Sequence, residues 1–382
     1  METRVPIEQN SSFYHPELDA IRFLAFMFVF FHHAFPREAI WYHKLFRSDW
    51  LCLFSASTVN AGGFGLCLFF TLSAYLIAEL LRREKHQTGT VHIQTFYRRR
   101  ILRIVPLYFL GMGLGLLFAA LRFHFHRDAL RLLSGAFMVE NWYAVRHGWS
   151  GNPMTHLWSI SVEGQFYLFW PWVALKAGKR GLYGTCLVMA AVANGCLIYL
   201  GHAHANLDYR IWANSFVQLY MFAAGILIAL VLRGRVPRIR GLYRGAIFLS
   251  GLACWQIASL GFRIKQFGDA SSSAQLVAGY SFVALGCAAL LLSLFGANPN
   301  KFPPAVIYLG RISYGLYVYH LLGLDGAKWI AEHYFTFSYR DSIGTLLGLS
   351  FTIALAAASF RYFESPFLRA KRKLEYVRTI PS

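Results

Sequence analysis

Long blocks of apolar residues, separated by short polar loops, constrain this chain more than any other feature. The blocks run for about 18–25 residues, the length that an α-helix needs to cross roughly 30 Å of hydrocarbon. They predict membrane helices over residues 18–36, 61–81, 101–121, 156–175, 182–200, 212–232, 245–262, 275–296, 305–324 and 342–360. The sequence therefore predicts an all-α membrane protein, a polytopic bundle of about ten transmembrane helices.

Composition supports this prediction. The 382 residues are 56% hydrophobic and only 14% charged, whereas a soluble protein of this length is about 25% charged. Aromatic residues gather near the block ends, as they do at membrane interfaces. The segment 132–143, LLSGAFMVENWY, is too short to span and is expected to re-enter the membrane or lie at its surface.

The formal net charge is +19, and most of the basic residues behind it lie in the loops between the apolar blocks. Basic residues concentrate in alternate loops, the pattern that marks the cytoplasmic side, and this predicts that both termini are cytoplasmic. The basic side chains concerned are Arg82, Arg83, Lys85, Arg98, Arg99, Arg100 and Arg103, then Lys176, Lys179 and Arg180, then Arg233, Arg235, Arg238, Arg240 and Arg244, and in the tail Arg369, Lys371, Arg372, Lys373 and Arg378. We expect the lipid bilayer, and no nucleic acid, to be the partner of these charges.

The same pattern predicts how the chain is divided. Residues 1–17 form a cytoplasmic N-terminal segment, 18–362 one transmembrane domain, and 363–382 a basic cytoplasmic tail. Residues 1–17 lack the features of a cleavable signal peptide, so the first helix is expected to be an uncleaved anchor. The six cysteines show no CxxC spacing and are expected to pack as small apolar residues. We predict no metal site, since HExxH and CxxC motifs are absent.

The stretch LDAIRFLAFMFVFFHHAF, Leu18 to Phe35, carries four ionisable residues in an otherwise apolar helix: Asp19, Arg22, His32 and His33. Arg22 and His33 are eleven residues, or about 16 Å, apart and share one helix face. An intramembrane Arg and His usually face a bundle interior or a wet cavity. Alternatively, His33 is a packed histidine and Arg22 extends to the interface. Asp19 could pair with Arg22 or cap the helix.

Two further stretches carry candidate site residues. In FYRRRILRIVPLY, Arg100 and Arg103 are one helical turn apart, a spacing that suits bidentate capture of phosphate, although simple membrane anchoring is the alternative. In THLWSISVEGQFYLFWPW, Glu163 would be costly in hydrocarbon unless it is paired or protonated. His156 lies two turns before it and is expected on the same face, with a polar helix–helix contact as the alternative.

Two late motifs favour a structural interpretation. ISYGLYVYHLLGL places His320 inside the predicted span 305–324. RYFESPFLRAKRK places Glu364 and Pro366 after the last span, where the following basic run would hold the tail in the cytoplasm.

Taken in order, these motifs resemble those of the acyltransferase 3 family of integral membrane proteins, which O-acylate carbohydrates and other envelope or secreted molecules. LDAIRFLAFMFVFFHHAF is similar to the family's LDGLRGIAALLVVLFHH, and FFTLSAYLIAELL to FFVLSGFLITRLL. FYRRRILRIVPLY resembles FYLRRALRILPLY, and HLWSISVEGQFYLFWP resembles HLWSLSVEEQFYLLWP. ISYGLYVYH and RYFESPFLR match the late patterns SYSLYLLH and RYFIERPFLR, so the resemblance spans positions 18 to 370.

The resemblance implies roles for particular residues. His33 would be catalytic, with Arg22 as its partner in the Arg-x10-His motif, and Glu163 would join them. Arg100 and Arg103 would contact the acyl-CoA donor, and Glu163 or Asp19 could orient the imidazole. Further family positions are occupied by Ser73, His156, Trp158, Ser161 and Tyr167. Ala20, Phe23 and Ala74 replace glycines of the family pattern, which is expected to change pocket shape.

The expected function is therefore an O-acyltransferase, and more narrowly an O-acetyltransferase, of a bacterial inner membrane. Acetyl-CoA or another acyl-CoA would be a co-substrate, with no permanently bound cofactor, and the acceptor would be a hydroxyl of a surface or secreted carbohydrate. One alternative keeps this chemistry but modifies a secreted small molecule or glycolipid. Another is a transporter of an envelope intermediate, which would change its location and not its mass. The sequence specifies no oligomeric state.

Overall fold

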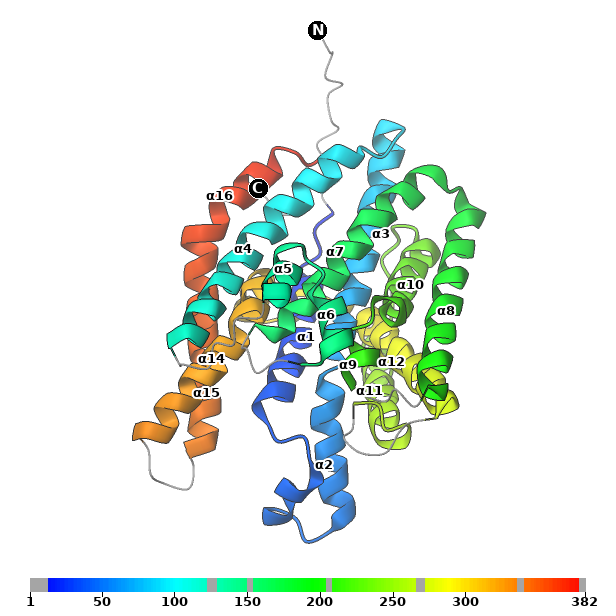
Figure 1. Ribbon diagram of the computed structural model, residues 1–382. Helices are drawn as coiled ribbons and strands as arrows, with labels where there is room; N and C mark the ends of the chain where they lie inside the picture. Colours follow the sequence, from blue (N-terminus) through cyan, green and yellow to red (C-terminus); the bar gives the residue numbers. More distant parts are fainter. Residues whose placement is uncertain are drawn as a thin grey trace.

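The computed structural model describes residues 13–121, 129–149, 154–203, 208–265, 272–334 and 340–377, and the regular elements in these ranges are all helical (Figure 1). The predicted all-helical class is thus confirmed. The first half contains α1 (Pro16–Ala34), η1 (Ala39–Lys44), α2 (Asp49–Gly62), α3 (Gly65–Thr88), α4 (Ile93–Leu121), α5 (Ala129–Ala136), α6 (Glu140–His147), η2 (Thr155–Leu157), α7 (Trp158–Lys176) and α8 (Lys179–His202).

The second half continues the same architecture. Its elements are α9 (Asp208–Trp212), α10 (Ser215–Leu232), α11 (Gly241–Gln256), η3 (Ile257–Gly261), α12 (Ser273–Leu294), η4 (Pro299–Lys301), α13 (Pro304–Arg311), α14 (Ser313–Tyr334), α15 (Arg340–Ser359), η5 (Phe360–Glu364) and α16 (Ser365–Arg372). The elements η3 and η5 are single π-helical turns.

Six helical segments of the described residues are long and apolar enough to cross a membrane. They are Asp49–Thr88, Ile93–Phe118, Lys179–His202, Ser215–Leu232, Ser273–Leu294 and Ser342–Arg372. The other predicted spans are occupied by α1, α7, α11 and α14, which are not among these six segments. In α1, for example, the charged residues Glu17, Asp19 and Arg22 make the helix less apolar. The chain is an integral membrane protein of apolar helices, while the number ten and the cytoplasmic placement of both termini stay predictions.

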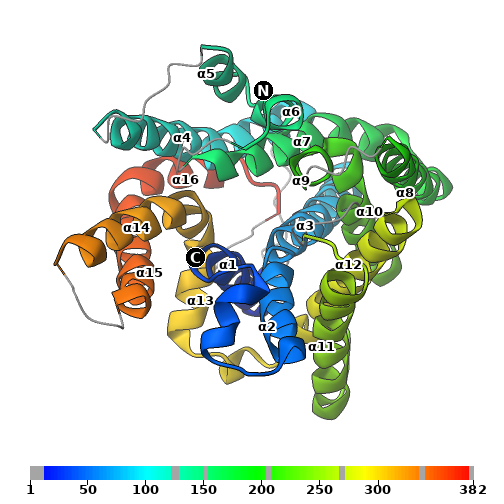
Figure 2. The same cartoon turned by 60° about the horizontal axis from the view of Figure 1, so that its bottom comes forward.

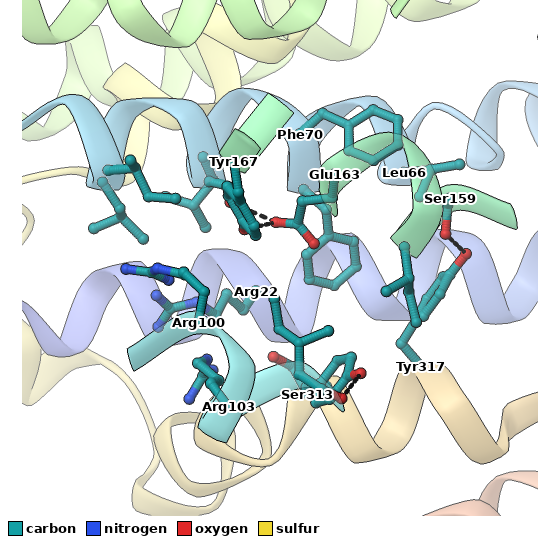
Figure 3. A pocket seen from close by; sticks show the side chains of 18 residues that line it. Arg22, Leu66, Phe70, Arg100, Arg103, Ser159, Glu163, Tyr167, Ser313 and Tyr317 are labelled. Atoms are coloured by element: carbon teal, nitrogen blue, oxygen red, sulfur yellow. Dashed lines mark hydrogen bonds between the residues drawn. The ribbon is translucent and has the colours of Figure 1, made fainter. Parts of the chain in front are cut away.

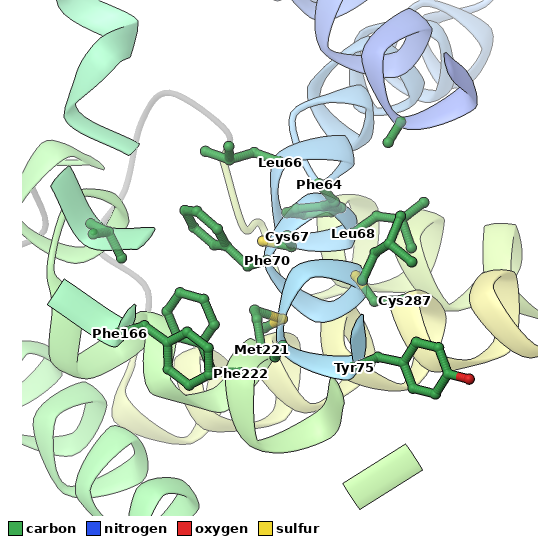
Figure 4. Close-up of a cluster of buried hydrophobic side chains, with 14 of the residues drawn as sticks. Phe64, Leu66, Cys67, Leu68, Phe70, Tyr75, Phe166, Met221, Phe222 and Cys287 are labelled. Carbon is green, nitrogen blue, oxygen red and sulfur yellow. The ribbon is translucent and has the colours of Figure 1, made fainter. Parts of the chain in front are cut away.

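Helix α3 lies at the centre of the bundle and packs against α1, α7, α10 and α12. The most apolar stretch of the segment that contains α3 is 78% buried inside the protein, whereas the corresponding stretches of α4 and α8 are 22% buried. Helices α4 and α8 therefore lie at the periphery of the bundle. Figure 4 shows the core where α3 meets its neighbours, and the rings of Phe166 and Phe222 stack there 4.3 Å apart. Residues along α3 are therefore placed to form the wall of an internal site.

Two glycines allow the close helix approaches that position α1 and α3. A Cβ added to Gly310 of α13 would lie 1.9 Å from the carbonyl oxygen of Asp19, so α13 abuts the start of α1 directly. A Cβ on Gly225 of α10 would lie 2.1 Å from the carbonyl oxygen of Thr71 in α3. Larger residues at either position would push apart the helices that carry the site.

The helices α14 and α15 form an extensive antiparallel pair on one side of the bundle, and α8, α11 and α12 lie on the other (Figure 2). The basic end of α3, the start of α4 and α16 gather at the same end of the molecule (Figure 1). This grouping agrees with the bias of basic residues that the sequence shows.

Three boundaries differ from the sequence prediction. The predicted span 305–324 is two helices, because the chain breaks at Ile312 between α13 and α14. The predicted loop after the first span contains α2, and the predicted tail contains α16. Pro366 lies in the first turn of α16, where its missing N–H costs no helical hydrogen bond. The segment 132–143 falls on the short helices α5 and α6, which agrees with the prediction that it does not span.

Most of the predicted N-terminal segment, residues 1–12, and Arg378 in the tail lie outside the described residues. The six cysteines are described, and each is a free thiol; four are fully buried, as expected of packing residues.

Candidate active site

A cavity of about 130 Å³ lies among α1, α3, α4, α7 and α14 (Figure 3). This volume corresponds to about four water molecules at the roughly 30 Å³ that each occupies in the liquid. Six of the residues predicted for the site line it: Arg22, Ser73, Arg100, Arg103, Glu163 and Tyr167. Three helices, α1, α4 and α7, thus bring the predicted arginines and the predicted carboxylate to one place.

Asp19 holds Arg22 at the cavity. Its carboxylate forms a close ion pair with Arg22 one turn further along α1, accepts a hydrogen bond of 3.1 Å from the hydroxyl of Tyr14, and lies 3.9 Å from the guanidinium of Arg311. Asp19 itself is buried and does not line the cavity. Of the two roles predicted for it, pairing with Arg22 is confirmed, whereas the position before the helix is occupied by His15.

Arg100 and Arg103 project from one face of α4 into the same cavity, as their spacing predicts. The guanidinium of Arg100 lies 5.4 Å from the ring centres of both Phe96 and Tyr167, and its buried Nε has no hydrogen-bond partner among the described residues. Figure 3 shows Arg22, Arg100 and Arg103 together at one end of the cavity. Three guanidinium groups at that end form a strongly cationic surface.

Glu163 is satisfied by two hydroxyl groups. Ser73 of α3 and Tyr167, one turn further along α7, both donate hydrogen bonds to Oε1 of Glu163, and their hydroxyl oxygens are 2.7 Å apart. A carboxylate inside a membrane bundle needs such donors because water is scarce there. The sequence left open whether Glu163 is paired or protonated; in the structure its partners are hydroxyl groups.

The other end of the cavity is closed by Tyr317 of α14 and Ser159 of α7 (Figure 3). Their hydroxyl oxygens are 2.6 Å apart, and both donate to the backbone carbonyl of His156, each at 3.0 Å. The backbone carbonyl of Tyr317 accepts a hydrogen bond of 2.6 Å from Nδ1 of His320. Tyr317 thus lines the cavity with its ring and is bonded on its far side to two histidine residues.

Beyond Tyr317, three histidines from different elements meet; we call His33, His156 and His320 the histidine cluster. The ring centres of His33 and His320 are 5.2 Å apart, and those of His156 and His320 are 4.7 Å apart. Tyr317 contacts His156 and His320 at 5.2 and 5.5 Å. The three histidines of the cluster do not line the cavity, whereas Arg22, on the same helix as His33, does.

His320 was interpreted as structural from the sequence, and the structure places it at the centre of the histidine cluster. It is fully buried, and because its Nδ1 faces a carbonyl oxygen, Nδ1 carries the proton and Nε2 bears the lone pair. That Nε2 has no hydrogen-bond partner among the described residues. The spacing of Tyr317 and His320, three residues apart on one helix face, is the signal that could have identified them together.

Several predicted residues lie elsewhere. Trp158 packs against the rings of Trp149 and Trp212, and Ser161 is buried away from the cavity. His32 donates from Nδ1 to the carbonyl of Val59 at 3.0 Å, which ties α1 to α2.

His156 lies in the 3₁₀ turn η2, directly before α7, and unlike Glu163 it does not line the cavity. That the two residues share a helix face stays a prediction. Neither Glu163 nor Asp19 is bonded to His33 in the described part of the chain; both carboxylates are engaged by other side chains. The neighbours of His33 are instead His32 and His320.

No group of three or more His, Cys, Asp or Glu side chains in the described ranges is arranged to hold a metal ion. The polar side chains of the cavity and the histidine cluster are arginines, hydroxyl groups, one carboxylate and imidazoles. This set suits the binding of an anionic group beside a proton-transfer step.

Comparison with known proteins relates this arrangement to a family. Residues 15–361 match the family model described as an acyltransferase domain. The O-acetyltransferase OatA of Staphylococcus aureus strain MRSA252 is 23% identical over 405 residues, which cover 96% of this chain and 61% of that protein. The same protein of strain NCTC 8325 matches with the same values.

The chain spans about six-tenths of the length of these curated relatives. No solved structure matches it. The family model covers nearly all of the predicted transmembrane domain, including both arginine motifs and the histidine cluster. The chain therefore belongs to the acyltransferase 3 family of integral membrane proteins.

Proposed function

We propose that this protein is a membrane O-acyltransferase that moves an acyl group, most simply acetyl, from acyl-CoA to a hydroxyl of a surface or secreted carbohydrate. One observation carries the proposal. Three arginines from two helices meet the hydrogen-bonded Glu163 in a single cavity, and Tyr317 at the other end of that cavity contacts the histidine cluster. The relatives named as O-acetyltransferases support the choice of acyl group.

The arginine end of the cavity suits the donor. Guanidinium groups bind phosphate oxygens through two parallel N–H bonds, and Arg100 and Arg103 present such forks one turn apart. With the pyrophosphate of acyl-CoA at this end, the pantetheine arm would extend along α3 toward Ser159 and Tyr317. The thioester would then lie beside the ring that separates the cavity from the histidine cluster.

The histidine cluster suits the acceptor side of the reaction. His33 would take the proton of the acceptor hydroxyl, the hydroxyl oxygen would form a bond to the thioester carbonyl carbon, and the C–S bond would break. The departing CoA thiolate would then receive the proton. A neutral imidazole performs this task well near neutral pH. Because Tyr317 lines the cavity and its ring contacts His156 and His320, the ring would turn aside when donor and acceptor are both bound.

The donor assignment can be tested with a matched pair of variants. The full-length protein would be reconstituted in liposomes with labelled acetyl-CoA and envelope carbohydrate, and the product mass would be recorded. Arg100→Ala/Arg103→Ala is expected to abolish acyl transfer. Arg98→Ala removes an exposed arginine of the same basic run, outside the cavity, and should leave transfer unchanged. Equal effects of the two substitutions would contradict the assignment.

The catalytic assignment has its own test. His33→Ala should abolish transfer while the protein still inserts in the membrane and still binds CoA. Full activity of His33→Ala would remove His33 from the reaction. A carbohydrate that changes location with no gain of an acyl group would overturn the proposed function and favour a transporter.

A further inference from the structure

The arginine end of the cavity has more positive charge than the protein itself neutralises. Among the described residues, neither Arg100 nor Arg103 forms a hydrogen bond or ion pair with a carboxylate. The nearby carboxylate of Glu163 is bound by hydroxyl groups, and that of Glu364 accepts a hydrogen bond from Ser359 at 3.3 Å. Two like charges one turn apart repel each other, and partly buried cations without partners are costly. An anion bound at this end would remove that cost.

A fourth cation lies close to the three arginines at this end of the cavity. Lys371 of α16 is only 7% exposed, and the charges of Arg103 and Arg100 act on its ammonium group. Helix α16 packs directly against α4, which carries both arginines. The ammonium is 2.7 Å from the carboxylate of Glu375. Lys371 itself does not line the cavity.

Lys371 differs from the other basic residues of the tail. Arg369, Arg372 and Lys373 are exposed, as expected of side chains that meet water or lipid headgroups. Desolvation and repulsion from the two arginines both act against the burial of this lysine. Its ion pair with Glu375 offsets part of that cost, and a bound anion would offset more.

The segment after α16 is fastened in place, and this holds Lys371 at the arginines. The carbonyl of Leu374 accepts a hydrogen bond of 3.1 Å from Arg99, whose guanidinium also pairs with Glu84 at 2.6 Å. The ring of Tyr376 stacks on that of His92, 4.5 Å away. Residues 371–377 are therefore docked on the start of α4.

We propose that Lys371 completes a phosphate-binding site with Arg100 and Arg103, and that it receives the 3′-phosphate of the CoA moiety of the donor. This inference rests on the proposed function. The forked guanidinium groups suit the pyrophosphate, while a compact ammonium suits a phosphomonoester as a point charge. Along CoA, the ribose phosphate is farther from the thioester than the pyrophosphate. Lys371 lies outside the cavity lining, on the helix that packs against the helix of both arginines.

The test compares two ligands that differ by one phosphate. CoA and 3′-dephospho-CoA are titrated by calorimetry into the full-length protein in nanodiscs of phosphatidylcholine. The unsubstituted protein should bind CoA roughly ten- to a hundredfold more tightly than 3′-dephospho-CoA, as expected for one charge-assisted contact. Lys371→Gln should remove this preference by weakening CoA alone, and Lys371→Arg should keep most of it. The exposed neighbour Lys373→Gln is the matched control and should change neither affinity.

Each other outcome decides against the inference. If Lys371→Gln weakens both ligands equally, the lysine acts on the fold of α16 and not on the phosphate. If it changes neither affinity, while Arg100→Ala/Arg103→Ala weakens both, the proposed function stands and the role of Lys371 is overturned. A lipid headgroup as the true anion would show as a dependence on phosphatidylglycerol in the nanodisc with no effect on CoA. No binding of CoA by any form would overturn the proposed function as well.

Discussion

The ion pair between Asp19 and Arg22 gives the sharpest test of how the cavity is held together. Asp19 does not line the cavity, so its substitution should act on the donor only through Arg22. The two side chains are 5% and 24% exposed, which makes this a partly buried pair open to the cavity on the arginine side. Asp19→Asn keeps the size of the side chain and removes its charge.

The magnitude follows from burial. Removing one partner of a fully buried pair costs about 3–5 kcal/mol, whereas a surface pair contributes about 0–1 kcal/mol. Because Arg22 retains access to the cavity, we expect a coupling energy of about 1–3 kcal/mol between the two side chains. Tyr14 and Arg311 also contact the Asp19 carboxylate, so the single substitution should lower the free energy of unfolding by somewhat more than this coupling.

The assay is a double-mutant cycle of Asp19→Ala, Arg22→Ala and the double variant, with the free energy of unfolding measured by SDS titration in mixed micelles. The KM for acyl-CoA is measured in parallel, and Asp19→Asn should raise it with little further effect once Arg22 is alanine. Glu17→Gln is the control, because Glu17 is equally buried on α1 but bonds to the backbone of Gly296. A coupling below about 0.5 kcal/mol, or effects on KM that simply add, would refute the reasoning.

Three further predictions concern other parts of the site and its surroundings. His320→Ala should lower the rate of acyl transfer at least about a hundredfold and leave the affinity for CoA unchanged, because it removes the imidazole beside His33. The control is His333→Ala, at an exposed position of the same helix, which should have no effect. Equal transfer rates of the two variants would contradict this prediction. Glu163→Gln should slow turnover but tighten CoA binding several-fold, since it removes a negative charge from a cavity proposed to bind a polyanion. Weaker CoA binding, measured by calorimetry, would argue against the placement of CoA in this cavity. Burial raises the pKa of Glu140 to about 7 in spite of the nearby Arg131, so the folded state binds this proton more tightly than the unfolded state does. The free energy of unfolding should therefore fall by up to about 3 kcal/mol as the pH rises from about 4.5 to 7. Unfolding curves of Glu140→Gln should lack this slope, and a slope that persists would assign it to another group.

The parts of the site that could be predicted from the sequence are those that depend on one helix at a time. Arg100 and Arg103 share a face because they are one turn apart, and both do line the cavity. Glu163 was expected to find partners because an unpaired carboxylate is costly in hydrocarbon. The limit of this reasoning is seen at His156, which lies in a 3₁₀ turn before α7 and contacts His320 of α14, whereas Glu163 lines the cavity.

The histidine cluster and the docked tail could not be predicted in this way. His33, His156 and His320 are separated by more than a hundred residues each, and their meeting depends on how α1, η2 and α14 pack. Likewise, Lys371 is one of several basic residues in its segment, and its burial follows from contacts of Leu374 and Tyr376 with the start of α4. In the sequence it is indistinguishable from its exposed neighbours.

The sequence by itself determined that this is a helical membrane protein, which stretches form most of its helices, and which family it resembles. These properties follow from local quantities: the length of an apolar block, the 1.5 Å rise per residue and the order of short motifs. Only the tertiary structure decided that Tyr317 separates the arginine cavity from the histidine cluster, and that Asp19 serves to hold Arg22. The physical reason is that the rotation and depth of each helix are set by close packing against partners distant in the chain, such as the abutment of Gly310 on Asp19.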